Sequence, residues 1–291
     1  MSAEPPAPES AAFMRRFSLE ATRPNAPEIE ALAETLPADT PLYLTAVPTQ
    51  DSHELIATAA AARKAGIEPV AHIAARRLAS ADALKELLAG LRGEADMRQL
   101  LLIGGDIDKA GVFADALAVI QRGCLREAGI EEIGIGAYPE GHPRIPAGRL
   151  EAALDEKIAA ATALGLRVHI ISQFSFSPER ILAWLKQLRA CGIGKPVKIG
   201  MAGPTSVPAL LRYAKRCGVA ASLRGLVSGA VSGLVGHVAP GRIIETLSAA
   251  GDLGDVAPHY FSFGGTLETA HYACEAAARR RGASRAMARS N

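Results

Sequence analysis

The sequence predicts a single (β/α)8 barrel of the TIM type, and two observations carry this prediction. Short apolar runs alternate along the chain with longer amphipathic segments, as expected when each strand is followed by a helix. The runs are almost continuously apolar, which is typical of parallel strands covered on both faces. Eight of them occur, at residues 17–19, 42–44, 69–71, 100–103, 133–135, 168–171, 197–201 and 260–263. Eight strand–helix units in a chain of 291 residues fit a closed barrel better than an open sheet.

The segments between these runs have recognisable helix ends. Asp51 can cap a helix that ends at Gly66, and Ser177 can cap a later one, because a side-chain oxygen there accepts from the free amide groups of the first turn. Pro178, directly after Ser177, has a backbone φ already suited to that turn. The connection between the last two runs, residues 204–259, is long. We therefore expect extra helices between the seventh and eighth strands.

Composition and length exclude several classes of protein. The formal net charge of +2 argues against a nucleic-acid-binding surface, and no apolar stretch reaches the roughly 18 residues needed to span a bilayer. The first residues lack the basic-then-apolar order of a signal peptide. We expect a cytoplasmic protein without nucleic-acid or membrane partners. Its barrel is expected over residues 13–280, with a disordered N-terminal segment (1–12) and a flexible tail (281–291).

Polar side chains follow the predicted strands at the points where they end. The carboxyl ends of parallel barrel strands converge on one mouth, where such folds carry out chemistry. The residues concerned are Glu20, Thr45, His72, Asp106, Tyr138, His142 and Gln173. Each of them also has a structural explanation, such as a helix cap, a rigid turn or a buried histidine. The prediction of a small-molecule site therefore rests on the whole ring.

Three familiar kinds of site are missing from the sequence. No H-x-x-x-H pair or cluster of carboxylates and histidines has the spacing of metal ligands, so no metal site is predicted. Gly104-Gly105 lacks both the dinucleotide-binding spacing and a Walker lysine. The G-x-S-x-G nucleophile elbow is absent, which disfavours a serine hydrolase.

Five motifs at predicted strand ends occur in an order that identifies a family. The most specific is A-Y-P-E-G-H-P at residues 137–143. The others are F-S-L-E at 17–20, P-V-A-H at 69–72, G-D at 105–106 and I-S-Q-F at 171–174, with Y-F-S-F at 260–263 in the place of a last barrel strand. Together they resemble the methylenetetrahydrofolate reductase family, and the resemblance extends over residues 17–278.

The resemblance implies reduction of 5,10-methylenetetrahydrofolate to 5-methyltetrahydrofolate, with a hydride passed from NADH or NADPH through bound FAD. It implies that Glu20 is the general acid that opens the five-membered ring, and that Asp106 is a second catalytic residue near flavin and pterin. Gln173, with Asp106 and Glu20, is implied to bind the folate. The residues implied to bind FAD are Thr45, His72, Gly104, Gly105, Asp106, Tyr138, His142 and Lys157.

The chain departs from the family pattern in three places. Gly104 replaces the arginine before G-D, and residues 21–24 read A-T-R-P where the family has F-F-P-P. The helix before Gln173 is nearly all alanine around Ala160, and Lys157 is its nearest cation to the expected FAD phosphates. Loss of charge-assisted phosphate contacts costs roughly several kcal/mol of cofactor affinity.

These departures leave several alternatives open. Flavin binding can be weak, the phosphate-binding cation can be relocated to Arg23 or Arg224, or hydride can pass directly from nicotinamide to folate. A non-catalytic folate-binding barrel is a further alternative, although retention of Glu20, Asp106 and Gln173 favours an enzyme. The same chemistry can also run in reverse, in a demethylation pathway.

Two properties are left undecided by the sequence. No residue that reads the nicotinamide ribose can be assigned, so NADH and NADPH stay equal candidates. A homo-oligomer is possible, and the apolar stretch at residues 226–238 is the candidate subunit contact.

Overall fold

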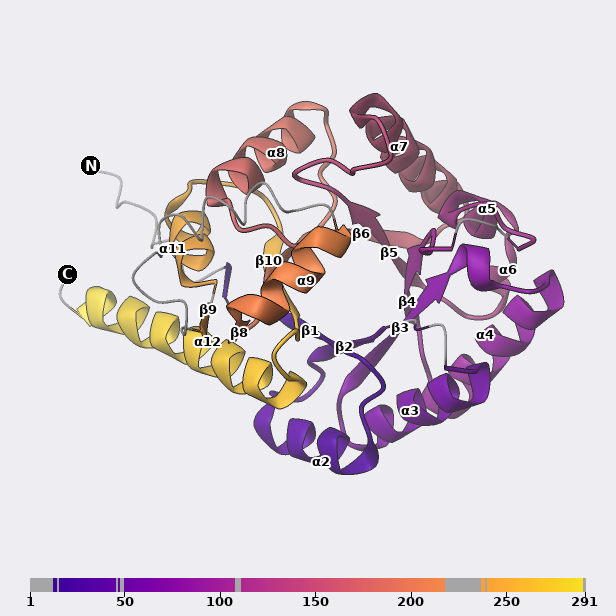
Figure 1. Cartoon of the computed structure of the whole chain (residues 1–291), viewed down its shortest axis with the longest axis horizontal. Coiled ribbons are helices and arrows are strands. Elements are labelled where there is room, and N and C mark those ends of the chain that lie inside the picture. The colour runs from indigo at the N-terminus through magenta and orange to yellow at the C-terminus, as the bar shows by residue number, and fades with distance from the viewer. Residues whose placement is uncertain are drawn as a thin grey trace.

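The structure is a computed structural model that describes residues 13–14, 16–45, 47, 50–107, 111–217, 237–238 and 240–289. Eight parallel strands close into a barrel surrounded by helices (Figure 1). In order around the ring they are β1 (Ser18–Ala21), β2 (Pro41–Leu44), β3 (Glu68–Ala74), β4 (Gln99–Ile103), β5 (Glu132–Ala137), β6 (Arg167–Ser172), β7 (Val197–Ala202) and β10 (Val256–Phe261). Each predicted run overlaps one of these strands, which confirms the predicted (β/α)8 barrel.

Several of the helices begin beside a capping side chain. The helices are α2 (Ala26–Thr35), α3 (Ser52–Lys64), the short η1 (Ala75–Arg77), α4 (Ala81–Ala95), α5 (Ala116–Gln121), α6 (Cys124–Glu127), α7 (Ala147–Ala163), α8 (Pro178–Ala190), α9 (Val207–Cys217), α11 (Gly241–Ala249) and α12 (Thr266–Arg289). Those with a capping side chain are α2, α3, α4, α5 and α8. Asp51 accepts a hydrogen bond from the amide of Glu54 (2.8 Å), and Ser177 accepts one from Arg180 (3.2 Å), as predicted. None of the helices in the described ranges combines the length and apolar character needed to cross a membrane.

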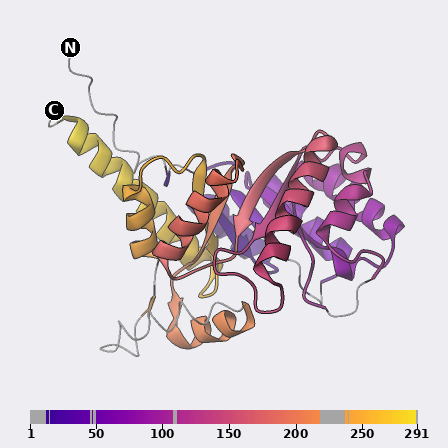
Figure 2. The same ribbon diagram turned by 90° about the horizontal axis from the view of Figure 1, so that it is seen from above.

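The connection between β7 and β10 contains additional elements, as predicted. It holds α9, α11 and a two-stranded antiparallel ribbon of β8 (Thr205–Ser206) and β9 (His237–Val238). In Figure 1, α9 lies in front of the strands and within the outline of the ring of helices, and Figure 2 shows it beyond one end of the barrel. Arg224, most of residues 226–238 and residues 1–12 lie outside the described residues.

Two predicted boundaries differ from the structure. The last barrel strand was expected at residues 260–263, but β10 runs from Val256 to Phe261 because it pairs with β7 along that whole length. Beyond it, the amide of Phe263 bonds to the carbonyl of Phe261 in a turn. At the C-terminus, α12 continues to Arg289, so the tail expected from residue 281 is helical as far as residue 289. The limits of the catalytic domain and the cytoplasmic location stay predictions.

The interior of the barrel is unusually polar. TIM barrels generally fill this space with branched apolar side chains. Here the ring of Tyr43 makes edge contacts with His72, His169 and His259, at centroid distances of 6.0, 6.3 and 4.7 Å. Gly134 on β5 makes room for one of them, because a Cβ there would come within 2.6 Å of Nε2 of His169. Four strands thus bring titratable rings together inside the barrel.

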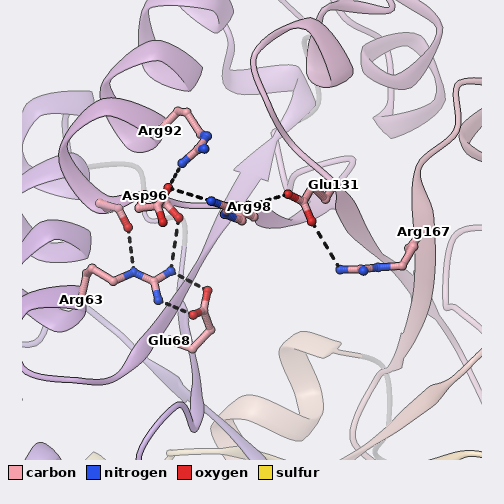
Figure 3. Close-up of polar contacts among 8 residues, drawn as sticks. Arg63, Glu68, Arg92, Asp96, Arg98, Glu131 and Arg167 are labelled. Atoms are coloured by element: carbon pink, nitrogen blue, oxygen red, sulfur yellow. Dashed lines mark hydrogen bonds and ion pairs between the residues drawn. The ribbon is translucent and has the colours of Figure 1, made fainter.

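The amino ends of the strands are joined by a network of ion pairs (Figure 3). Its pairs are Arg63–Glu68, Arg92–Asp96, Arg98–Asp96, Arg98–Glu131 and Arg167–Glu131. These residues come from the beginnings of β3 and β6, from the segments that enter β4 and β5, and from α3 and α4. The network therefore links neighbouring units at the end of the barrel opposite the mouth, where side chains of such folds generally serve stability.

Candidate active site

Glu20 lies near the carboxyl end of β1, inside the mouth of the barrel. Its side chain is 12% exposed, and its Oε1 is 3.2 Å from Nε2 of His259 on β10. On the other side of the imidazole, Nδ1 is 2.8 Å from the hydroxyl oxygen of Ser18. All three groups are satisfied when Ser18 donates to Nδ1 and the Nε2 hydrogen is donated to the carboxyl group of Glu20. Ser18 thereby selects the tautomer of His259 that holds Glu20 in place.

His72 on β3 faces the same carboxyl group without bonding to it. Its Nε2 is 3.6 Å from Oε1 of Glu20, within range of an ion pair but too far for a hydrogen bond. Burial lowers the pKa of His72 and outweighs the opposite effect of the Glu20 carboxylate, so the imidazole is neutral at neutral pH. Within the described part of the chain, this buried Nε2 has no hydrogen-bond partner. A bound molecule is the natural partner for such an atom.

Burial also controls the protonation of Glu20 and His259. It raises the pKa of Glu20, an effect that the nearby His72 partly opposes. It lowers the pKa of His259 well below the ordinary value, and the charge of Lys198 lowers it further. Glu20 is therefore a buried carboxyl group between two neutral imidazoles. A carboxyl group in such surroundings retains its proton at higher pH and can act as a general acid.

Asp106 lies on the loop after β4, at the same end of the barrel as Glu20. Gly104 and Gly105 lead into this loop, and Gly105 has a φ of +94°, which a side chain would strain. The carboxylate of Asp106 forms an ion pair with Arg77 from η1, and its side chain is 46% exposed. The two predicted catalytic carboxyl groups thus share the mouth in different surroundings, one buried and one half-exposed beside a cation.

Thr45 and Gln173 lie on the rim, directly after β2 and β6. Both the amide and the hydroxyl of Thr45 donate to the carbonyl of Ala21, at 3.0 and 3.1 Å. Oε1 of Gln173 accepts from the amide of Phe174 at 3.0 Å, which orients the side-chain amide. Because that bond uses only the oxygen, the two amide hydrogens of Gln173 can be donated to a ligand.

The predicted Tyr138 and His142 are brought together, whereas Lys157 lies elsewhere. The rings of Tyr138 and His142 meet edge to face at 5.2 Å, and Nδ1 of His142 accepts from the amide of Arg144. Burial lowers the pKa of His142, so this imidazole is neutral as well. Lys157, midway along α7, is half-buried and interacts with Asp115 at the start of α5. It is not part of the group around Glu20.

An aromatic wall at the mouth was missed by the sequence reasoning. Its members are Phe174, Phe176, Tyr213, Phe261 and Phe263. Tyr213 on α9 stacks on Phe263 at 4.2 Å with an interplanar angle of 16°, and Phe174 contacts Phe261 and Phe263 edge to face. A signal was present, because F-S-F occurs at both 174–176 and 261–263. Ser18 and His259 were missed as well, since both lie within strands and not after them.

A comparison with known families identifies the family of this chain. The sequence model described as methylenetetrahydrofolate reductase matches residues 39–222, more than half of the chain. The chain belongs to the methylenetetrahydrofolate reductase family. Membership indicates an oxidoreductase that acts on a folate. The matched residues include the loops after β2 to β6, whereas β1 with Glu20 and β10 with His259 lie outside them, so the pairing of these two residues is a finding of the structure.

Solved structures similar to this reductase-family chain support the fold alone. Dihydropteroate synthase from Thermus thermophilus in complex with 6HMPPP is 15% identical, with a TM-score of 0.52 over 92% of this chain and 94% of that one. A second structure of the same synthase is 17% identical, with a TM-score of 0.51 over 92% and 95% of the two chains. At such low identity the likeness concerns the barrel and not its chemistry.

Three cations of this reductase-family barrel, Arg23, Arg77 and Lys157, each interact with a carboxylate of the protein. Arg23, considered above for phosphate binding, donates to both carboxylate oxygens of Glu54, at 3.3 and 3.0 Å. Arg77 is paired with Asp106, and Lys157 interacts with a carboxylate outside the group around Glu20. A dinucleotide phosphate that binds to one of these cations must displace or share its present partner.

Proposed function

We propose that this chain reduces 5,10-methylenetetrahydrofolate to 5-methyltetrahydrofolate with a hydride from NADH or NADPH. The observation that carries the proposal is the buried carboxyl group of Glu20, held by His259 at the mouth of a barrel of this family. Ring opening requires a proton donor that is still protonated near neutral pH. Burial raises the pKa of Glu20 and its two imidazole neighbours are neutral, which favours the protonated form.

Glu20 supplies the proton of the proposed reaction. Its proton goes to the ring nitrogen that leaves the methylene carbon, and the electron pair of the broken carbon–nitrogen bond stays on that nitrogen. The remaining iminium carbon accepts the hydride and becomes the methyl group. The Glu20 carboxylate then takes up a proton from water. The uncharged His259 keeps its hydrogen bond to Glu20 in both states, because either form of the carboxyl group can accept it.

Side chains around Glu20 offer contacts suited to a pterin. Gln173 can donate its amide hydrogens to a ring nitrogen or carbonyl, and Asp106 can accept from the amino groups of the ring. The carboxylate of Asp106 is paired with Arg77. The aromatic wall provides flat apolar surface on which a heterocycle can stack.

The residues at the mouth suit the ring system of FAD better than its phosphates. Thr45, the loop 104–106, Tyr138 and His142 would hold its ring system, and the unpartnered Nε2 of His72 offers a polar contact. When bound, FAD supplies the two-step passage of the hydride from nicotinamide to folate. Its phosphates meet cations that already have protein partners. We therefore propose that FAD binds more weakly here than charge-assisted phosphate contacts would allow.

Direct hydride transfer from nicotinamide to folate is the second candidate. The observation that favours it is the engagement of Arg23 with Glu54, because a phosphate bound to Arg23 must displace or share this partner. In this case Glu20 has the same role, because the folate half of the reaction is unchanged. The direction of the reaction is also open, since an enzyme accelerates the forward and the reverse reaction alike.

Turnover assays distinguish these possibilities. Purified protein is incubated with methylenetetrahydrofolate and either NADH or NADPH, with and without added FAD, and nicotinamide absorbance is followed. FAD-dependent oxidation supports the main proposal, and oxidation that ignores FAD supports direct transfer. The visible spectrum of the fresh protein shows whether flavin is retained. Folate binding without turnover under every condition would contradict both and leave the non-catalytic barrel.

A further inference from the structure

Tyr43 crosses the barrel lumen beside Glu20. It stands on β2, level with Glu20 on the neighbouring β1, and its side chain is fully buried. Its ring contacts His259 at 4.7 Å with an interplanar angle of 78°. Its hydroxyl reaches Nε2 of His169 on β6, at 2.8 Å. The ring therefore spans the lumen from β2 to β6 and passes against the histidine that holds Glu20.

A second group of charged residues lies closer to the amino ends of the strands. The ammonium group of Lys198 on β7 stands over the ring of Tyr43, 5.6 Å from its centroid. On β10, Lys198 is level with Ala257, which comes two residues before His259. Ser18 on β1 is level with His259, and Glu20 follows Ser18 by two residues. The backbone of Lys198 therefore lies four residues closer to the amino ends of the strands than that of Glu20, which is two inward-facing positions.

Tyr43 is held across the lumen by a chain of hydrogen bonds. Nδ1 of His169 is 2.7 Å from Oε1 of Glu132, at the amino end of β5, and Arg167 binds the other oxygen at 3.1 Å. With the Nδ1 hydrogen given to Glu132, Nε2 of His169 is free to accept the hydroxyl hydrogen of Tyr43. Burial raises the pKa of Tyr43 far above its ordinary value, so the phenol keeps that hydrogen.

We propose that Tyr43 is a positioning residue that separates Glu20 from Lys198 and from water at the amino end of the barrel, and so keeps Glu20 protonated. This inference rests on the proposed function for its purpose, because a general acid needs its proton. The separation itself can be measured without turnover. The titratable groups that face Glu20 are His72 from β3, His259 from β10 and Tyr43 from β2.

The charge of Lys198 explains why a barrier matters. Burial lowers the pKa of Lys198 to about 8, so the group still carries its charge at neutral pH. A cation that approached Glu20 would stabilise the carboxylate, and water in the lumen would do the same. Glu132, at the amino end of β5, opposes the effect of burial on the pKa of Lys198. The face of the Tyr43 ring stabilises the charge of Lys198, so that Glu20 does not have to.

Titration of Glu20 in matched variants tests the inference. The carboxyl signal of Glu20 is followed by carbon NMR with labelled glutamate and assigned with Glu20→Gln. Tyr43→Phe keeps the ring and should leave the pKa of Glu20 nearly unchanged. Tyr43→Ala opens the lumen and should lower it by more than about 1, because an unscreened charge at short range has at least that effect. Lys198→Met alone should change little, and added to Tyr43→Ala it should restore part of the loss.

Several results would overturn the inference. One is an unchanged titration of Glu20 in folded Tyr43→Ala, and another is a shift in Tyr43→Phe as large as in Tyr43→Ala. If Tyr43→Ala does not fold, Tyr43→Leu takes its place, since it removes the ring while filling part of the space. A purely structural role would lower the melting temperature without moving the titration. Absence of folate turnover in the unmodified chain would refute the proposed function and leave this titration interpretable.

Discussion

Two glutamates at opposite ends of one lumen are held in opposite states. Glu20, at the mouth, lies beside neutral imidazoles, and burial raises its pKa. Glu132, at the amino end, bonds to His169 and Arg167, and its pKa is lowered chiefly by the bond to His169. The surroundings thus favour the protonated form of the carboxyl group at one end and the ionised form at the other. The number and charge of the neighbouring groups decide which form of the carboxyl group is favoured.

Other polar groups at the two ends of the barrel also differ in how many have partners. Buried polar atoms near the mouth lack partners in the described structure, such as Nε2 of His72 and the hydroxyl oxygen of Ser262 after β10. At the amino end many charged groups are paired in the network of ion pairs (Figure 3), although Nη2 of Arg189 has no partner in the described structure. Unsatisfied groups reduce stability and are retained where a ligand will satisfy them. Under the proposed function, the chemistry at the mouth is thus separated from the ion-pair network at the amino end.

The largest expected effect comes from removing the proton at the mouth. Glu20→Gln should lower the folate-dependent kcat by about 10²-fold or more, because general acid catalysis contributes at least that factor. Its matched control is Glu131→Gln at the amino end, which should retain turnover. The measurement is steady-state kinetics with either nicotinamide. Equal losses in the two variants would mean that the two ends are not functionally distinct.

The second effect concerns space inside the lumen. Gly134→Ala places a Cβ within 2.6 Å of Nε2 of His169, so this imidazole must move away from Tyr43. We expect a loss of roughly 1–3 kcal/mol in the free energy of unfolding, which is typical of overpacking. Gly136→Ala, on the same strand with no atom within 4 Å of its Cβ, is the control and should be nearly neutral. Urea unfolding of both variants checks this, and similar values would contradict the tight fit at His169.

The third effect is a pH dependence of opposite sign for the two glutamates. The folded pKa of Glu20 lies above the ordinary 4.5, so the folded state binds the extra proton and stability falls as the pH rises from 4.5 through the folded value. The folded pKa of Glu132 is lowered, so its stabilisation is present above 4.5 and is lost as the pH falls through the folded value.

Unfolding free energies of Glu20→Gln and Glu132→Gln, measured against the unmodified chain across this range, check both signs. On raising the pH, Glu20→Gln should gain stability relative to the unmodified chain. Glu132→Gln should lose it. Parallel curves for the two variants would show that the two carboxyl groups have similar surroundings.

Much of the fold could be predicted because its signals are local. Apolar runs mark the strands, and Asp51 and Ser177 mark helix starts through contacts with residues three positions away. β10 was placed too late because its first half contains Pro258, a residue that usually argues against a strand. Pairing with β7 overrides that local signal, and pairing partners are not visible in a single strand.

The candidate site was only partly accessible to sequence reasoning. Residues after strand ends, such as Asp106 and Gln173, could be predicted because all strand ends of a barrel share one mouth. Tyr43 and His259 could not, since a continuous apolar run does not show which side chains face the lumen. Lys157 was assigned through the resemblance, and its interaction with Asp115 depends on how α7 packs beside α5, which is a tertiary property.

The smallest expected effect is at the surface of the amino end. Arg98→Ala removes the contacts to Glu131 (2.8 Å) and Asp96 (3.6 Å), but the arginine side chain is 48% exposed. Exposed ion pairs contribute about 0–1 kcal/mol, so we expect a loss of stability within that range that shrinks as salt is added. Folate turnover should be unchanged, since the network lies at the far end from Glu20. A larger loss that persists in high salt would show that the network acts as one buried unit, and that the amino end stabilises the barrel more than its exposure suggests.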